Sequence, residues 1–269
     1  MSDTENPYRS PAATVVDFSP ATGEIEYAAP AHVLNAGHGT TWISNGWQLF
    51  KDAPLMWGCA MLLYAGVSFI LNLIPILGSI AGMLLAPSLS VGILAFGRAH
   101  ARDGVTDLGL MFSGFKGEKL GQLMIMALLY VAAIVVTVIV MIIMLAIGLG
   151  GMSAISQLEA GNFSGLLGGS GGLMMLVLLL FFLTAVFLIV GAYWFAPGLI
   201  FFANLSPVDA LKESLMACLR NWLPLTVYSL VAMVIFLVGA IPFGLGLLVV
   251  FPVMMASLYP MFEDLYGRE

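Results

Sequence analysis

The length of its uncharged runs constrains this chain most. Four stretches contain no Asp, Glu, Lys or Arg, and they are residues 54–97, 120–158, 160–208 and 221–262. A helix that crosses the apolar core of a bilayer needs about 20 predominantly apolar residues. The first and last runs are each long enough for two such helices, and the middle two, separated only by Glu159, provide a third pair. We therefore predict an all-α, polytopic membrane helical bundle with six transmembrane helices.

Composition excludes an ordinary water-soluble domain. Hydrophobic residues make up 61% of the chain and charged residues 9%, whereas soluble domains contain about 25% charged residues. Nine Lys and Arg residues against fifteen Asp and Glu give no basic footprint for nucleic acid. The two cysteines, Cys59 and Cys218, are predicted to be small packing residues, not a disulfide or a catalytic thiol.

We expect a transmembrane domain over residues 42–265. Its boundaries follow from turn residues, from proline and glycine positions and from charges. The predicted spans are about 54–74, 76–97, 120–148, 173–202, 222–241 and 243–262. The glycine-rich segment 148–172 is expected to be a flexible external loop.

Small residues and prolines predict special packing within the spans. Gly78 and Gly82 begin a row of small residues spaced by four in the second span, and such a face lets helices approach closely. Contact within the chain is the better expectation, with contact to a second copy as the alternative. Pro87, Pro197 and Pro252 lie inside the second, fourth and sixth spans, where proline removes a backbone hydrogen bond and kinks a helix.

A short amphipathic segment precedes each predicted pair of spans. In the first, Ile43, Trp47 and Phe50 share one helical face and Lys51 lies at the end, which suits the membrane interface. The second covers about 108–119, where several glycines predict a broken interfacial helix. The third follows Ser206-Pro207, a strong helix start. We expect three pseudo-repeated hairpins, each entered through an interfacial segment.

The basic residues predict the orientation. Positively charged residues gather on the cytoplasmic side of membrane proteins. With six spans and a cytoplasmic N-terminus, every Lys and Arg falls on that side: Arg9, Lys51, Arg98, Arg102, Lys116, Lys119, Lys212, Arg220 and Arg268. We therefore predict six crossings with both termini in the cytoplasm.

Residues 1–41 are expected to form a disordered, acidic cytoplasmic tail, because they contain four prolines and no apolar periodicity. They lack the basic start and apolar run of a cleaved secretory signal. The opening Asn6-Pro7-Tyr8-Arg9-Ser10-Pro11 indicates either a docking peptide or a proline-marked turn. His32 and His38 are six residues apart on this segment, which is a poor arrangement for zinc.

The predicted spans offer little chemistry. An enzyme or ion-coupled transporter usually has ionisable residues within the membrane, and these spans contain none. Glu263 and Asp264, at the end of the last helix, are expected on a solvated face. Asn72 is expected to serve helix packing. No catalytic, cofactor-binding or metal-binding residue is predicted, and no cofactor.

The positions of glycine, proline and aromatic residues in this chain resemble those in one known group of proteins. The chain is similar to uncharacterised six-helix inner-membrane proteins of proteobacteria and, more loosely, to the membrane domain of some glycerophosphodiester phosphodiesterases. The resemblance covers roughly residues 40–265. It rests on Gly46-Trp47, Ile74-Pro75-Ile-Leu-Gly78, Ala86-Pro87, Phe112-x-Gly-Phe115, Phe195-Ala-Pro197, Asn221-Trp222 and Pro252. These residues are structural, so the resemblance implies a six-helix fold and a location in the bacterial inner membrane but no activity.

Two functions remain open at this point. The first is a non-enzymatic scaffold or accessory factor of the cell envelope, with the lipid bilayer as its environment and a protein partner at the cytoplasmic face. The second is a passive or facilitated pathway for a small or lipidic solute. A continuous polar groove lined by Asn72, Ser88, Ser90 and Ser257 would favour the pathway. A membrane-embedded hydrolase ranks last.

Overall fold

The computed structural model describes residues 26–74, 77–117, 119–148, 161, 170–241 and 243–268. Within these ranges six helical stretches are long and apolar enough to cross a membrane. They are formed by α2 (Pro54–Asn72), α3 (Leu77–Asp103), α4 (Lys119–Gly148), α7 (Ser170–Trp194) with α8 (Ala196–Phe202), α10 (Trp222–Ala240) and α11 (Leu247–Tyr266). The prediction of a multi-pass helical membrane protein is confirmed.

Shorter elements precede each pair of long helices. They are α1 (His38–Asp52), the 3₁₀ helix η1 (Leu108–Phe115) and α9 (Pro207–Arg220). Two short strands, β1 (Glu26–Tyr27) and β2 (Gly267–Arg268), pair antiparallel and join the two ends of the described chain. The order of elements has the expected form, but equivalence of the three hairpins stays a prediction.

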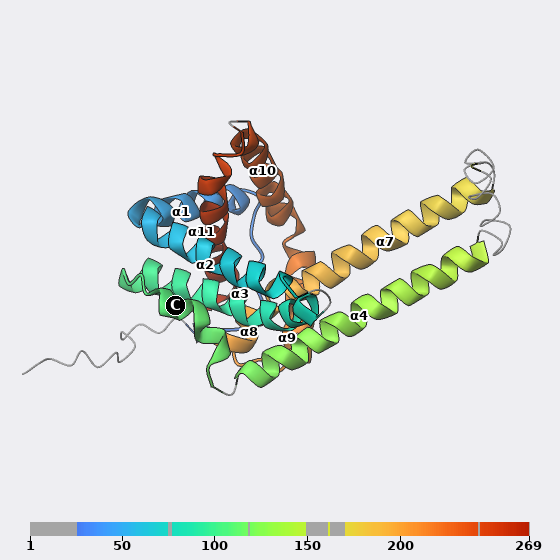
Figure 1. Ribbon diagram of the computed structural model, residues 1–269, viewed down its shortest axis with the longest axis horizontal. Coiled ribbons are helices and arrows are strands. Elements are labelled where there is room, and N and C mark those ends of the chain that lie inside the picture. Colours follow the sequence, from blue (N-terminus) through green and yellow to red (C-terminus); the bar gives the residue numbers. More distant parts are fainter. Residues whose placement is uncertain are drawn as a thin grey trace, which may run out of the picture.

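The centre of the molecule is formed by α3 and α11. In the apolar 18-residue stretch that could span the membrane, about half of the residues of α3 and 61% of those of α11 are buried. By contrast, the corresponding stretch of α4 has no buried residue. The helices α4 and α7 run side by side away from the rest of the chain (Figure 1). Such helices are apolar all round and need lipid to cover them.

Backbone contacts at glycines set the tightest helix crossings. A β-carbon at Gly46 of α1 would lie 2.7 Å from the backbone nitrogen of Ser257, so α1 rests directly on α11. One at Gly78 would lie 1.5 Å from the carbonyl oxygen of Leu71, which closes the α2–α3 hairpin within the chain. Gly82 has open space around it. The small-residue row therefore makes close contact at Gly78 and not at Gly82.

Several boundaries differ from those predicted. The fourth span is interrupted at Phe195, and Pro197 lies in the first turn of α8. The sixth helix begins at Leu247, four residues later than expected, because Phe243 and Gly244 have left-handed φ angles of 53° and 79° and cannot continue a helix. Pro87 and Pro252 lie inside continuous helices.

The second amphipathic segment forms the 3₁₀ helix η1 and packs against α3. A β-carbon at Gly114 of η1 would lie 2.3 Å from the carbonyl oxygen of Ser88. Likewise, one at Gly92 would lie 1.9 Å from that of Met111. Thus η1 packs backbone to backbone along the middle of α3.

The expectation of a disordered tail is wrong for residues 26–41. This stretch forms β1, an extended segment and the start of α1, and its backbone bonds to the end of α11. The physical reason is that the last carbonyl groups of a helix lack partners, and this segment supplies N–H donors to them. The proline-marked motif at residues 6–11, most of the glycine-rich loop and Glu159 lie outside the described residues.

Candidate functional site: the polar cluster at the ends of α3, α9 and α11

An extended strap connects β1 to α1. We define the strap as residues 28–37. The backbone N–H groups of Ala28 and His32 donate to the carbonyl oxygens of Tyr266 and Leu265, at 3.1 Å and 2.8 Å. These bonds cap the C-terminal end of α11. The strap therefore completes the last helix of the fold.

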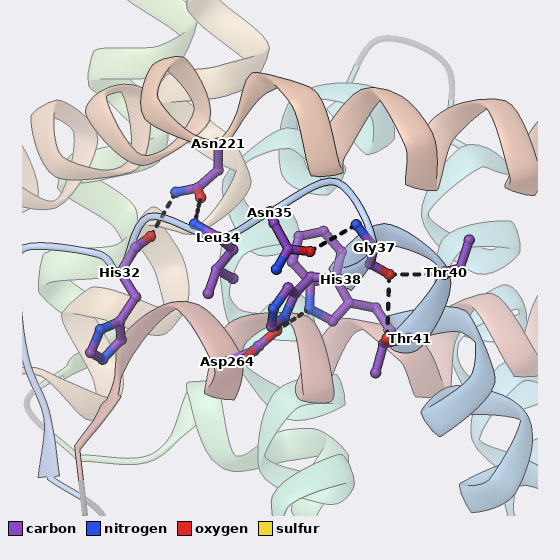
Figure 2. A network of polar contacts seen from close by, with 10 residues as sticks. His32, Leu34, Asn35, Gly37, His38, Thr40, Thr41, Asn221 and Asp264 are labelled. Carbon is purple, nitrogen blue, oxygen red and sulfur yellow. Dashed lines mark hydrogen bonds and ion pairs between the residues drawn. The ribbon is translucent and has the colours of Figure 1, made fainter.

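Asn221 fixes the strap from the other side. This side chain is fully buried at the junction of α9 and α10. Its Oδ1 accepts from the N–H of Leu34 at 2.8 Å, and its Nδ2 donates to the carbonyl oxygens of His32 at 2.9 Å and Ala217 at 3.1 Å. Figure 2 shows Asn221 and Asp264 on opposite sides of the strap. Both a donor and an acceptor are needed here, which an amide supplies.

Asp264 joins α11 to the start of α1. Its Oδ2 contacts Nδ1 of His38 at 2.7 Å (Figure 2). The same oxygen accepts from the indole Nε1 of Trp42 at 2.7 Å. Trp42 is 1% exposed, so its N–H requires an acceptor inside the protein. The Asp264 side chain is 32% exposed, so it meets solvent, and its bond to this buried donor is the feature that was not predicted.

Glu263 is also engaged. Its Oε1 is paired with Nη2 of Arg102 and accepts from the hydroxyl of Tyr259 at 3.0 Å. The Tyr259 hydroxyl accepts in turn from Nε of Arg102 at 3.0 Å and lies 3.1 Å from that of Tyr27 in β1. Burial raises the pKa of Tyr27, and the hydrogen bond to Tyr259 offsets part of this effect. The Glu263 side chain is 28% exposed, and its bonds to Arg102 and Tyr259 were not predicted. We call these bonded groups of Asp264 and Glu263 the polar cluster.

Two other basic residues, Arg98 and Lys119, differ from Arg102 in their neighbours. The guanidinium of Arg98 lies 5.5 Å from the ring centre of Tyr27 and 5.7 Å from that of Phe202. The ammonium of Lys119 contacts Oδ1 of Asn204 at 2.5 Å. In the described part of the chain, the ion pairs within 4.0 Å are Arg102–Glu263 and His38–Asp264. Arg98 and Lys119 thus have aromatic and amide neighbours in place of carboxylates.

The other predicted interfacial residues lie at separate places. Trp47 is 43% exposed and stacks on Phe50, with ring centres 5.8 Å apart. Lys51 and Arg220 are exposed in the last turns of α1 and α9, where positive charges complement the helix dipoles. Lys116 after η1 and Lys212 within α9 are also exposed. His100, near the end of α3, is buried and accepts a bond from Nε1 of Trp57 at 3.0 Å.

The polar residues proposed to line one groove are not brought together. Asn72 donates to the carbonyl oxygen of Ser68 in its own helix at 2.7 Å. Ser88 is buried under η1, and Ser257 bonds to the hydroxyl of Tyr228 at 2.8 Å. Asn72 lines a cavity of about 290 Å³ between α2 and α3 that neither of the other two reaches.

A larger, apolar groove of about 520 Å³ opens between α10 and the α2–α3 hairpin. It is lined by side chains including Met61, Tyr64, Trp194, Tyr228, Phe236 and Met254. Among the residues that the structure describes, no group of three or more His, Cys, Asp and Glu could hold a metal ion. Cys59 is exposed and Cys218 is buried, both as free thiols.

Sequence reasoning missed the polar cluster and the strap. The one available signal was the pair Glu263-Asp264 at the end of an otherwise uncharged run. That pair does not identify its distant partners, because Trp42 and Arg102 lie 222 and 161 positions away along the chain.

Comparison with known proteins gives one informative similarity. A probable inner membrane protein of Burkholderia thailandensis is 27% identical over 218 residues, which cover 80% of this chain and 78% of that protein. No family model matches the chain, and no solved structure matches it significantly. The expected likeness to a phosphodiesterase membrane domain gains no support. The six apolar helices and this similarity together support a multi-pass inner-membrane protein.

Proposed function

We propose that this protein is a non-enzymatic scaffold or accessory factor of the cell envelope, with a rigid platform at the cytoplasmic ends of its helices. The supporting observation is the polar cluster, in which Asp264 and Glu263 are bonded to Trp42, Arg102 and Tyr259. Here the two carboxylates join α11 to α1 and α3 through His38, Trp42 and Arg102, which suits a binding platform.

The platform's orientation is part of the proposal. Six crossings place all of the described basic residues on one side of the membrane. These residues lie in the last turn of α1, at the end of α3, around the start of α4, in α9 and after α11. The positive-inside rule then assigns that side to the cytoplasm. A phosphatase reporter fused after Gly161 should be active, and one fused after Glu269 inactive. The reverse pattern would refute this orientation.

The scaffold function is tested by crosslinking and affinity purification from native membranes. The informative comparison is the full chain against a chain lacking residues 1–25, because the strap belongs to the fold. We expect a stoichiometric membrane or cytoplasmic partner with the full chain, and reduced recovery without residues 1–25. Recovery of the protein alone in both cases would count against a scaffold.

The apolar groove favours one second function, a pathway for a lipidic solute. Its lining comes from five long helices and includes few polar groups, so it suits acyl chains better than a polar solute. Proteoliposomes with a fluorescent phospholipid test this function. Ala232→Trp should fill the groove and slow lipid movement between leaflets. A wild-type rate equal to that of protein-free liposomes would exclude it.

A further inference from the structure

Two basic side chains contact residues at the end of α8. Phe202, the last residue of α8, places its ring against the guanidinium of Arg98, and Asn204, two residues later, contacts the ammonium of Lys119. Arg98 comes from the last turns of α3, and Lys119 is the first residue of α4. The two cations are separated by a turn and η1 in the sequence, yet their contacts lie two residues apart on one segment.

A local backbone feature holds this arrangement. The N–H groups of Ala203 and Leu205 both donate to the carbonyl oxygen of Leu199, at 3.1 Å and 3.3 Å. Asn204 between them has a left-handed φ of 55°. This is the glycine-type helix end formed with asparagine. It turns the Asn204 amide toward Lys119 while Phe202 remains against Arg98.

Arg98 and Arg102 provide an internal contrast. They are four residues apart and therefore on one face of α3, and both flank the Tyr27–Tyr259 pair. Arg102 is neutralised by Glu263. In the described ranges, no carboxylate lies within 4.0 Å of Arg98 or Lys119. Among the described residues, these two partly buried positive charges therefore have no carboxylate partner, and an unpaired buried charge is costly unless an anion approaches.

We propose that Arg98 and Lys119, at the end of α8, bind the phosphate of an anionic phospholipid in the cytoplasmic leaflet. A guanidinium and an ammonium are both donors to phosphate oxygens. Tyr27, whose ring faces Arg98, belongs to a residue type that is enriched at headgroup level. The helix ends that carry the cations border apolar helices, so acyl chains can lie along α4 while the headgroup reaches the site.

The probe is phosphatidylglycerol added to the purified full chain in detergent, with binding measured by native mass spectrometry. Phosphatidylcholine is the comparison lipid. Each basic residue near an anionic surface contributes about 1 kcal/mol, so Arg98→Gln and Lys119→Gln should each weaken phosphatidylglycerol binding about fivefold. Added salt should reduce binding by the wild type more than by the double variant.

Lys116→Gln is the matched control, because it removes an exposed lysine three residues from Lys119. Equal losses for Lys116→Gln and Lys119→Gln would mean general surface attraction and overturn the proposal. So would equal binding of phosphatidylcholine, or full displacement by an equal concentration of inorganic phosphate, which would indicate a site for a soluble anion. Since Arg98 also packs on two rings, thermal unfolding of Arg98→Gln is measured in parallel, and Lys119→Gln decides if that variant fails to fold.

Discussion

Replacement of Asn221 by alanine should release the strap. The amide makes two bonds to it, from the N–H of Leu34 at 2.8 Å and to the carbonyl oxygen of His32 at 2.9 Å. A buried hydrogen bond contributes about 1 kcal/mol net, so Asn221→Ala should lower the free energy of strap opening by about 2 kcal/mol. Because 1.4 kcal/mol is a factor of about ten, the open population should rise about 30-fold.

Hydrogen exchange followed by mass spectrometry measures this opening directly. Amide exchange in peptides that cover residues 28–37 should accelerate about 30-fold in Asn221→Ala, while peptides from α2 should change little, because the opening is local. Asn221→Asp keeps the shape and the acceptor for Leu34. However, it places an oxygen against the carbonyl oxygen of His32, so it should not restore protection.

The control is Asn72→Ala, since Asn72 is exposed and bonds only within its own helix among the described contacts. It should leave exchange in the strap unchanged. The reasoning fails if Asn221→Ala accelerates the strap less than about threefold, or if Asn72→Ala has the same effect. Equal acceleration in the strap and α2 would mean global destabilisation, and it would also contradict a local role for Asn221.

Three further predictions concern a helix crossing, a buried hydrogen bond and a buried thiol. Gly46→Ala should cost about 1–3 kcal/mol, because its β-carbon would lie 2.7 Å from the α11 backbone, whereas Gly82→Ala should not lower the unfolding temperature. Asp264→Ala leaves a buried indole N–H without an acceptor and should cost about 1–3 kcal/mol in the same thermal assay. Burial raises the pKa of Cys218 to about 12 from 9.0. At pH 8 its thiolate should therefore be about a thousandfold scarcer than usual, and in Cys59→Ser protein N-ethylmaleimide should label it only after denaturation.

The membrane helices were predictable because their signals are local. An uncharged run long enough for two spans identifies a hairpin without knowledge of its neighbours. The start of α9 is also local: Ser206 accepts from the N–H of Asp209 at 3.2 Å, as a capping serine does. Pro54 likewise lies in the first turn of α2. Each of these features involves residues within a few positions of one another.

The polar cluster could not be predicted because its contacts are distant in sequence. Residues 28–37 are mostly small, with Val33 and Leu34 as their two larger apolar side chains, and in isolation such a segment lacks the apolar surface to fold. It becomes ordered because α11 offers unpaired carbonyl groups and Asn221 offers an amide. Similarly, Asp264 next to Glu263 indicates a solvated helix end until the buried indole of Trp42 is known to face it.

The strap also decides how a partner at the N-terminal segment can be detected. Removal of residues 1–41 would delete His38 and the donors to Tyr266 and Leu265, leaving the end of α11 without its cap. Loss of a partner in such a protein would not separate a binding defect from unfolding. Removal of residues 1–25 stops before β1 and keeps all of these bonds. Partner loss at an unchanged unfolding temperature would then identify the first 25 residues as the binding segment, because the platform itself would be intact.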